Sequence, residues 1–254
     1  YDLSQKIISV NNLKDQIDYF FKTLIIDIEF KDSRWILTSQ GGTKFESKFL
    51  VCSSNLLLHK RSLEILNVNQ IPFRKAIPNN MDKGIDSIIS LLEKQNYIQR
   101  LVFMIYTKPS YYYKDNYKRV NRYFFLNNLL EEKYKFERII FQMQHNKNLG
   151  IVLHSRNSEF INYFFQSKNK TKFEINLLQN FNALFNKNPL INKLIDYQDI
   201  SVMKWRASQP SGLGVPEQYQ ICQNFNIGFC GDWIALDGFG RIEGAILSGL
   251  KLAD

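Results

Sequence analysis

The chain has 254 residues, of which 44% are hydrophobic and 22% are charged, as in ordinary globular proteins. These values exclude collagen-like, disordered and coiled-coil chains, and no apolar stretch approaches the roughly 18 residues that cross a bilayer. The net charge is +9, from 33 Lys and Arg against 24 Asp and Glu. This charge can attract an anionic partner, but an AT-rich genome gives the same excess of lysine, so the charge alone indicates no partner.

The first elements are a predicted helix and three strands. Residues 11–21 favour a helix, because Leu13, Ile17 and Phe20 recur at helical spacing. Strands are expected at 23–30, 35–39 and 48–52. Turn residues separate them, Lys31-Asp32-Ser33 first and Gly41-Gly42 second. The pattern therefore predicts an antiparallel meander.

The rest of the chain mixes helices and strands without a regular alternation. Helices are expected at 56–66, 86–94, 157–165, 173–185 and 240–253. Strands are expected at 101–107, 138–144, 150–155, 200–207 and 226–230. No internal repeat accompanies this order. It predicts an α/β fold with an inserted α+β domain.

Cysteine and histidine offer little chemistry. Cys52, Cys222 and Cys230 are too few for a disulfide framework, so we expect small core residues in a reducing compartment, the cytoplasm. The three histidines have no partner at metal-ligand spacing. Motifs of Ser-His-Asp hydrolases, zinc proteases and P-loop enzymes are also missing from the sequence. We therefore expect no metal site.

One segment interleaves tyrosines with cations. Lys108–Tyr123 reads KPSYYYKDNYKRVNRY. Aromatic rings that stack bases beside cations that hold phosphates are typical of single-strand nucleic-acid binding. A lysine-rich surface loop between two strands gives the same string, and we favour that interpretation. Nucleic acid is thus an unlikely partner.

The C-terminal segment is the most informative one. It combines a strand at 227–230, the Gly231-Asp232 turn, a loop and a helix whose first turn contains Gly240, Glu243 and Gly244. Gly238-Phe239-Gly240 leaves that helix end uncovered by side chains. A glycine at a strand end lets backbone approach a ligand, and Asp232 can accept hydrogen bonds from sugar hydroxyls. The helix start offers free amides and a positive dipole end to a negative group. Packing alone is the alternative, since small residues such as Gly244 and Ser248 can seat the helix on a sheet.

This segment, GDW followed by GRIEGAILSGLKLA, resembles the end of FAD-dependent oxidoreductases of the flavin amine oxidase superfamily, and most of all its renalase-like branch. The resemblance implies that FAD binds noncovalently and accepts a hydride from a small substrate. The implied cofactor-binding residues are Gly231, Asp232, Trp233, Gly240, Arg241, Glu243, Gly244 and Ala245. It implies no catalytic side chain, because the flavin carries the chemistry.

Weaker likenesses lie upstream in the same order. They are Val10–Leu13, the strand with Trp35, Phe49–Ser53, and Lys204–Pro210. The last places Trp205 on the substrate side of the flavin. One family feature is missing: the strand–GxGxxG–helix that binds the ADP half of FAD occurs nowhere in these residues. We therefore expect an FAD-binding, Rossmann-like domain that is incomplete at its N-terminus.

The resulting expectation is two interleaved domains. Residues 1–54 and 196–254 would form the partial FAD domain, and 55–195 a mixed-sheet substrate domain. The alternatives are a truncated relative that does not retain FAD or, less favoured, a basic nucleic-acid-binding domain. The sequence identifies neither the substrate nor the oligomeric state.

Overall fold

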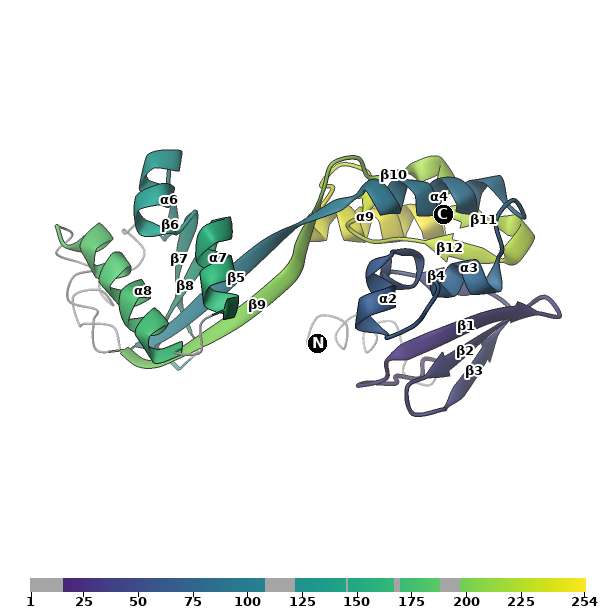
Figure 1. Ribbon diagram of the computed structural model, residues 1–254, viewed down its shortest axis with the longest axis horizontal. Helices are drawn as coiled ribbons and strands as arrows, with labels where there is room; N and C mark the ends of the chain where they lie inside the picture. The colour runs from purple at the N-terminus through teal and green to yellow at the C-terminus, as the bar shows by residue number, and fades with distance from the viewer. Residues whose placement is uncertain (1–15, 108–121, 145, 167–169, 188–196) are drawn as a thin grey trace. The chain divides into compact units, whose positions relative to one another are not determined.

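The computed structural model describes residues 16–107, 122–144, 146–166, 170–187 and 197–254 (Figure 1). The chain divides into two compact units. Unit 1 comprises Tyr1–Lys94 and Leu213–Asp254, and unit 2 comprises Gln95–Gly212. Each unit has its own hydrophobic core. The elements of each are described separately below.

Unit 1 contains the expected meander, shifted at its third strand. Strands β1 (Ile25–Lys31), β2 (Arg34–Ser39) and β3 (Lys44–Ser47) pair antiparallel in that order. The expectation of a third meander strand at 48–52 was wrong. The Gly41-Gly42 turn is tight enough for pairing to resume at Lys44, and the chain bends at Lys48 and leaves the sheet.

The apolar residues after that bend enter a different sheet. Strand β4 (Leu50–Cys52) pairs in parallel with β12 (Ile227–Phe229), and β11 (Ile221–Cys222) pairs antiparallel on the far side of β12. The amide of Leu50 donates to the carbonyl of Asn226, and the carbonyl of Cys52 accepts from the amide of Cys230, so both residues bond on the side of β12. The N–H and C=O of Val51 therefore face the other edge, where no described strand pairs with β4.

Short helices and two 12-residue helices complete the described part of unit 1. They are η1 (Leu56–Leu58), α2 (Arg61–Ile65), α3 (Pro72–Ala76), α4 (Lys83–Lys94), η2 (Glu217–Tyr219), η3 (Gln223–Phe225) and α9 (Ile242–Ala253). Helix α4 buries Ile85, Ile88, Ile89 and Leu92, an apolar stripe at helical spacing. The parallel strands β10 (Val215–Pro216) and β13 (Ile234–Ala235) form a two-stranded sheet of their own, and β10 contacts α4.

Aromatic side chains join two of the three sheets described in unit 1. The indole Nε1 of Trp35 donates a 2.7 Å hydrogen bond to the carbonyl of Phe225. The ring of Phe73 lies 5.7 Å from Trp35 and 6.0 Å from Phe229 between centroids. The meander is thereby packed onto the sheet that carries the C-terminal motif.

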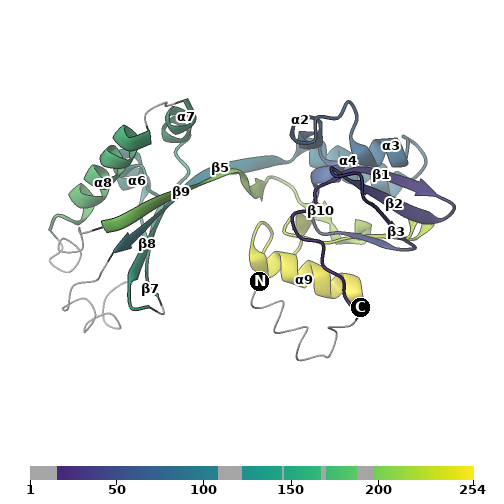
Figure 2. The ribbon, with the colours of Figure 1, turned by 90° about the horizontal axis from the view of Figure 1, so that it is seen from below.

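Unit 2 is a five-stranded antiparallel sheet with helices on one face (Figure 2). The strand order is β6 (Tyr123–Phe125), β7 (Arg138–Met143), β8 (Leu149–Ser155), β5 (Asn96–Thr107) and β9 (Tyr197–Ser211). The helices are α6 (Asn128–Tyr134), α7 (Ser158–Gln166) and α8 (Lys170–Phe185). Leu101, Phe103 and Ile105 of β5 alternate toward the helices, where Phe103 stacks on Phe173.

The structure differs from several sequence expectations. Residues 16–22 form no helix, and the rest of the expected helix at 11–21 lies outside the described residues, as does most of the tyrosine-rich segment 108–123. The units also divide at other residues than 54 and 195. Leu58, Phe73 and Ile88 belong to the core of unit 1, and β9 keeps residues 197–211 in unit 2.

Candidate functional site

The turn after β12 requires glycine for reasons internal to the chain. Gly231 has a φ of +135°, where a side chain is strained. A Cβ at Gly231 would lie 2.5 Å from Nε1 of Trp233 and 2.6 Å from the carbonyl of Ser53. The indole of Trp233 is 2% exposed and donates to that same carbonyl at 3.4 Å. The side chain of Trp233 therefore packs in the core, next to the turn.

Asp232 carries the one carboxylate of this turn. Its backbone carbonyl accepts a 2.7 Å hydrogen bond from the amide of Gly240, which ties the turn to the loop before α9. The carboxyl group is half-buried, and burial raises its pKa, opposed only by a bond from its own amide. No other residue in the described ranges donates to it. This carboxylate is thus available to hydroxyl groups of a ligand.

Helix α9 begins without a side-chain cap. Its N-cap is Arg241, whose backbone is extended and whose side chain accepts no capping bond. Gly238 and Gly240 precede it with φ of +80° and +72°. Within the described chain no acceptor bonds the amides of residues 242–244, and Arg241, Ile242 and Glu243 are exposed. The helix end therefore presents free donors and the positive end of its dipole.

Two expected site residues have packing roles. A Cβ at Gly244 would lie 2.4 Å from the carbonyl oxygen of Gly238, so this glycine seats the helix against its own loop. The amide of Ala245 donates to the carbonyl of Arg241 at 3.1 Å. That amide is therefore used inside the helix. The expectation that this amide is free for a cofactor is therefore not met, and among the described residues the exposed residues of the first turn whose amides have no acceptor are Ile242 and Glu243.

Ser248 is a residue of this site that the sequence analysis weighed only as a packing residue. Its Oγ accepts the amide of Gly231 at 2.8 Å and lies 2.8 Å from the carbonyl of Ala245, to which it donates. It thus links α9 to the strand-end turn. The signal in the sequence was its spacing, four residues after Gly244 and on the same helix face.

Trp205 lies in unit 2, apart in the chain from the other site residues. It pairs with Arg100 across β9 and β5, and 46% of its surface is exposed. Its neighbours Lys204 and Arg206 point to the opposite face, toward the rings of Phe164 and Phe165. The alternation of the strand therefore separates Trp205 from both cations.

The geometry of unit 1 fits a nucleotide cofactor. A carboxylate without an external donor among the described residues, the two exposed amides of Ile242 and Glu243 and a glycine-containing loop occur within residues 231–244. The carboxylate can accept hydrogen bonds from hydroxyl groups of a ligand. The amides can donate to a negative group such as a diphosphate or an anionic ring. Among the described residues, no group of three potential metal ligands occurs. None of the helices in the described ranges is long and apolar enough to cross a membrane.

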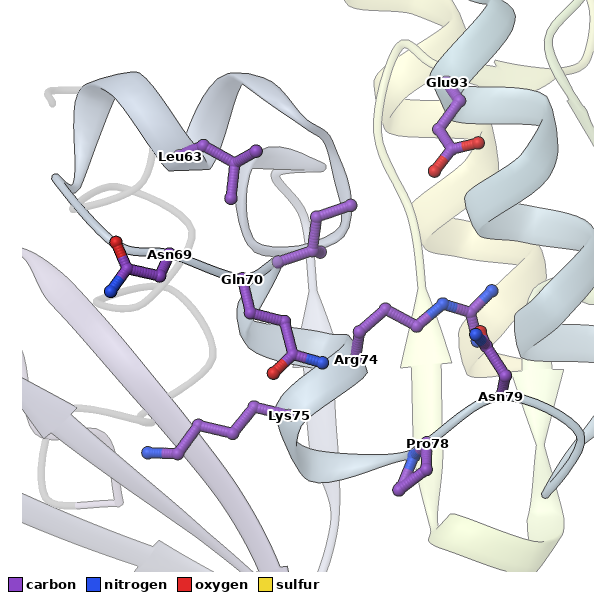
Figure 3. Close-up of a pocket in the computed structure, with 9 residues that line it drawn as sticks. Leu63, Asn69, Gln70, Arg74, Lys75, Pro78, Asn79 and Glu93 are labelled. Atoms are coloured by element: carbon purple, nitrogen blue, oxygen red, sulfur yellow. The ribbon is translucent and has the colours of Figure 1, made fainter.

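A separate pocket of about 760 Å³ lies in the first part of unit 1 (Figure 3). It is lined by residues of α2, α3 and α4 and by the loops between them, and by none of the expected site residues. Its cations are already paired. Arg74 contacts Asp86, and Nζ of Lys75 lies 2.6 Å from Asp27. The pocket therefore offers no free charge to an anionic cofactor.

Solved structures with the same fold exist. A putrescine oxidase triple mutant, made in a redesign of cofactor binding, aligns with a TM-score of 0.63 at 13% identity, over 97% of this chain and 50% of that one. Wild-type putrescine oxidase bound to putrescine aligns with a TM-score of 0.56 at 11% identity over the same shares. No protein-family model and no curated protein matches. The mixed α/β chain thus has the fold of part of a putrescine oxidase and spans about half its length.

Proposed function

We propose that this chain is part of an FAD-dependent oxidoreductase related to the amine oxidases, with FAD held noncovalently by unit 1. The observation that carries the proposal is the half-buried Asp232 carboxylate, without an external donor, beside the uncapped start of α9. The shared fold with putrescine oxidase supports the class. The renalase-like branch rests on the sequence resemblance at residues 231–253.

Each residue of the site has a defined role in this proposal. Asp232 accepts hydrogen bonds from ribityl or ribose hydroxyls, and the positive φ of Gly231 and Gly240 shapes the turn and the loop on either side of it. The amides of Ile242 and Glu243 donate to a negative group, and Arg241 adds positive charge. Glu243 lies exposed in the first turn of α9. When bound, the flavin supplies the acceptor for a hydride, which no side chain of this chain could replace.

The substrate side is proposed to lie in unit 2, where Trp205 stands exposed on the sheet face without helices. An indole there offers an apolar ring to a small organic substrate. With free cysteines at Cys52, Cys222 and Cys230, the cytoplasm remains the proposed location.

The test is the flavin content of the protein produced from its full coding sequence. Oxidised flavin gives visible absorbance that purified protein should retain, and acid precipitation should release it into the supernatant because the attachment is noncovalent. Asp232→Asn should lower flavin content per chain while the melting temperature of the apoprotein stays the same.

Residues 1–254 alone should bind FAD weakly, because they contain no GxGxxG turn to hold its diphosphate. Titration of flavin fluorescence measures this affinity. Full-coding-sequence protein that takes up no flavin under any condition would eliminate the oxidoreductase proposal. Flavin retained after acid precipitation would contradict the noncovalent attachment alone.

A further inference from the structure

One face of the sheet in unit 2 is apolar and carries none of the helices that the structure describes in that unit. The strand register places on it Tyr123, Phe125, Ile140, Met104, Met203 and Trp205, which we call the open face. None of the six belongs to the core cluster that the helices cover. Phe125 is 75% exposed and Tyr123 58%. An exposed aromatic surface of this kind is a feature of ligand-binding faces.

A cluster of charged groups lies at one end of the open face. Arg156 forms a bidentate pair with Glu131, at 3.0 and 3.1 Å. Its Nε also lies 3.2 Å from Glu137, which contacts Arg100 as well. Two carboxylates therefore neutralise two guanidinium groups.

Arg138 is the third guanidinium of the cluster and has no carboxylate partner in the described part of the chain. One of its Nη atoms lies 3.3 Å from Nδ1 of His154. Burial and the charges of Arg138 and Arg100 lower the pKa of His154 to about 4, so its ring is neutral near pH 7. The cluster therefore keeps one uncompensated positive charge. Nε of Arg138 is buried without an acceptor, which adds to the deficit of negative charge around it.

The register aligns this charge with the apolar surface. Arg138 pairs with His154, which pairs with Val102, which pairs with Met203. Adjacent strands lie about 4.8 Å apart, so the three steps of this row span about 14 Å between the backbone of β7 and that of β9, the strand of Trp205. A cation at one end of an apolar row is complementary to a molecule with an acidic head and an apolar body.

We propose that the open face binds an organic carboxylate with an apolar body, its carboxylate pairing with Arg138 and its body lying over the row that ends at Met203. A planar guanidinium is the side chain best matched to a carboxylate. That this ligand is the substrate rests on the proposed function, but its binding requires no flavin. The inference would narrow the substrate class to acids.

The experiment is calorimetric titration of residues 1–254 without flavin, using three probes of equal chain length: octanoate, octanamide and octylamine. Octanoate should bind at least about tenfold more tightly than the amide, because a bond between charged groups replaces a neutral one, and the amine should not bind. Inorganic phosphate serves as a fourth probe. Arg138→Gln should abolish the preference for the acid, and Arg138→Lys should keep part of it.

Two further variants locate the site. Arg34→Gln removes one exposed arginine from unit 1 and should bind octanoate as the parent does. Phe125→Asp places a carboxylate opposite Arg138 in the register and should displace octanoate without loss of folding, since Phe125 is exposed. Equal binding of acid and amide, no binding of octanoate, or phosphate binding without carboxylate binding would each overturn the proposal. Each result stands whether or not flavin binds unit 1.

Discussion

The Cα of Gly244 lies so close to the carbonyl of Gly238 that a Cβ would come within 2.4 Å of its oxygen. Real Cβ atoms do not approach so closely, and the contacting atom is backbone, which cannot turn aside. The sequence analysis left open whether Gly244 serves a ligand or packing. The contact supports packing of the helix against the loop. That loop directly precedes the first turn of α9, where the free amides lie.

We expect Gly244→Ala to destabilise the protein by about 1–3 kcal/mol, because the methyl group overpacks against backbone. Gly249→Ala is the matched control in the same helix, where a Cβ meets nothing within 4 Å. The control should stabilise by up to about 1 kcal/mol through helix propensity. Urea unfolding of both variants measures the difference, and equal effects of the two changes would refute the packing role.

Ser248→Ala should cost about 1–3 kcal/mol, because it leaves the buried amide of Gly231 without its acceptor. Ser87→Ala tests the same change in α4, where the hydroxyl donates to the carbonyl of Lys83 at the surface. That control should change stability by less than about 0.5 kcal/mol. Thermal unfolding compares them. If both variants melt with the parent, Ser248 does not link the helix to the turn.

Asp232→Asn should leave the apoprotein as stable as the parent or more so at pH 7. Burial raises the pKa of this carboxyl, so the folded state disfavours its ionised form, and its contribution to stability improves as the pH falls through the raised pKa. In the flavin-loaded protein the same change should weaken FAD binding about 10- to 150-fold, because a hydrogen bond to a charged group contributes about 1.5–3 kcal/mol. Dissociation constants and apo melting curves separate the two effects. Unchanged FAD affinity would remove Asp232 from the site.

His154 should make stability depend on pH in a defined window. Its pKa is about 4 in the folded chain and about 6.5 when unfolded. The unfolded state therefore takes up the proton first, and stability is lost as the pH falls from about 6.5 to about 4. After allowance for solvent screening, the loss is roughly 1–2 kcal/mol.

The side chain of the variant His154→Asn cannot take up a proton, so this variant should lose less stability over the same pH range. Urea unfolding at pH 7 and pH 5 measures the difference between the two proteins. An NMR titration of the imidazole gives the pKa directly. A midpoint near 6.5 in the folded protein would contradict the environment described for His154.

Strongly periodic segments were predictable from the sequence. Helix α4 and strands β7 and β8 follow from apolar spacing alone, since each buries one regular face. The Gly231-Asp232 turn and the start of α9 were also foreseen, because glycines at fixed positions mark where backbone conformations change.

Long-range pairing was not predictable. Leu50–Cys52 looks like the next strand of the meander, but it pairs with β12, about 180 residues away in the chain. The lengths of β5 and β9 also exceeded expectation, because polar residues at their ends pair with each other outside the apolar core. The charge cluster around Arg138 joins residues of three strands and α6, and no local pattern marks it.

The edge of β4 that no described strand pairs with bears on how these residues behave in isolation. Along a three-residue strand, the amides of Leu50 and Cys52 are held by β12, whereas the amide of Val51 faces outward and the side chain is 49% exposed. Hydrogen–deuterium exchange should therefore alternate from slow to fast to slow within one strand. Such an edge can pair with a strand of another molecule. This chain should therefore aggregate as its concentration rises, and Val51→Lys should reduce the aggregation, as light scattering measures.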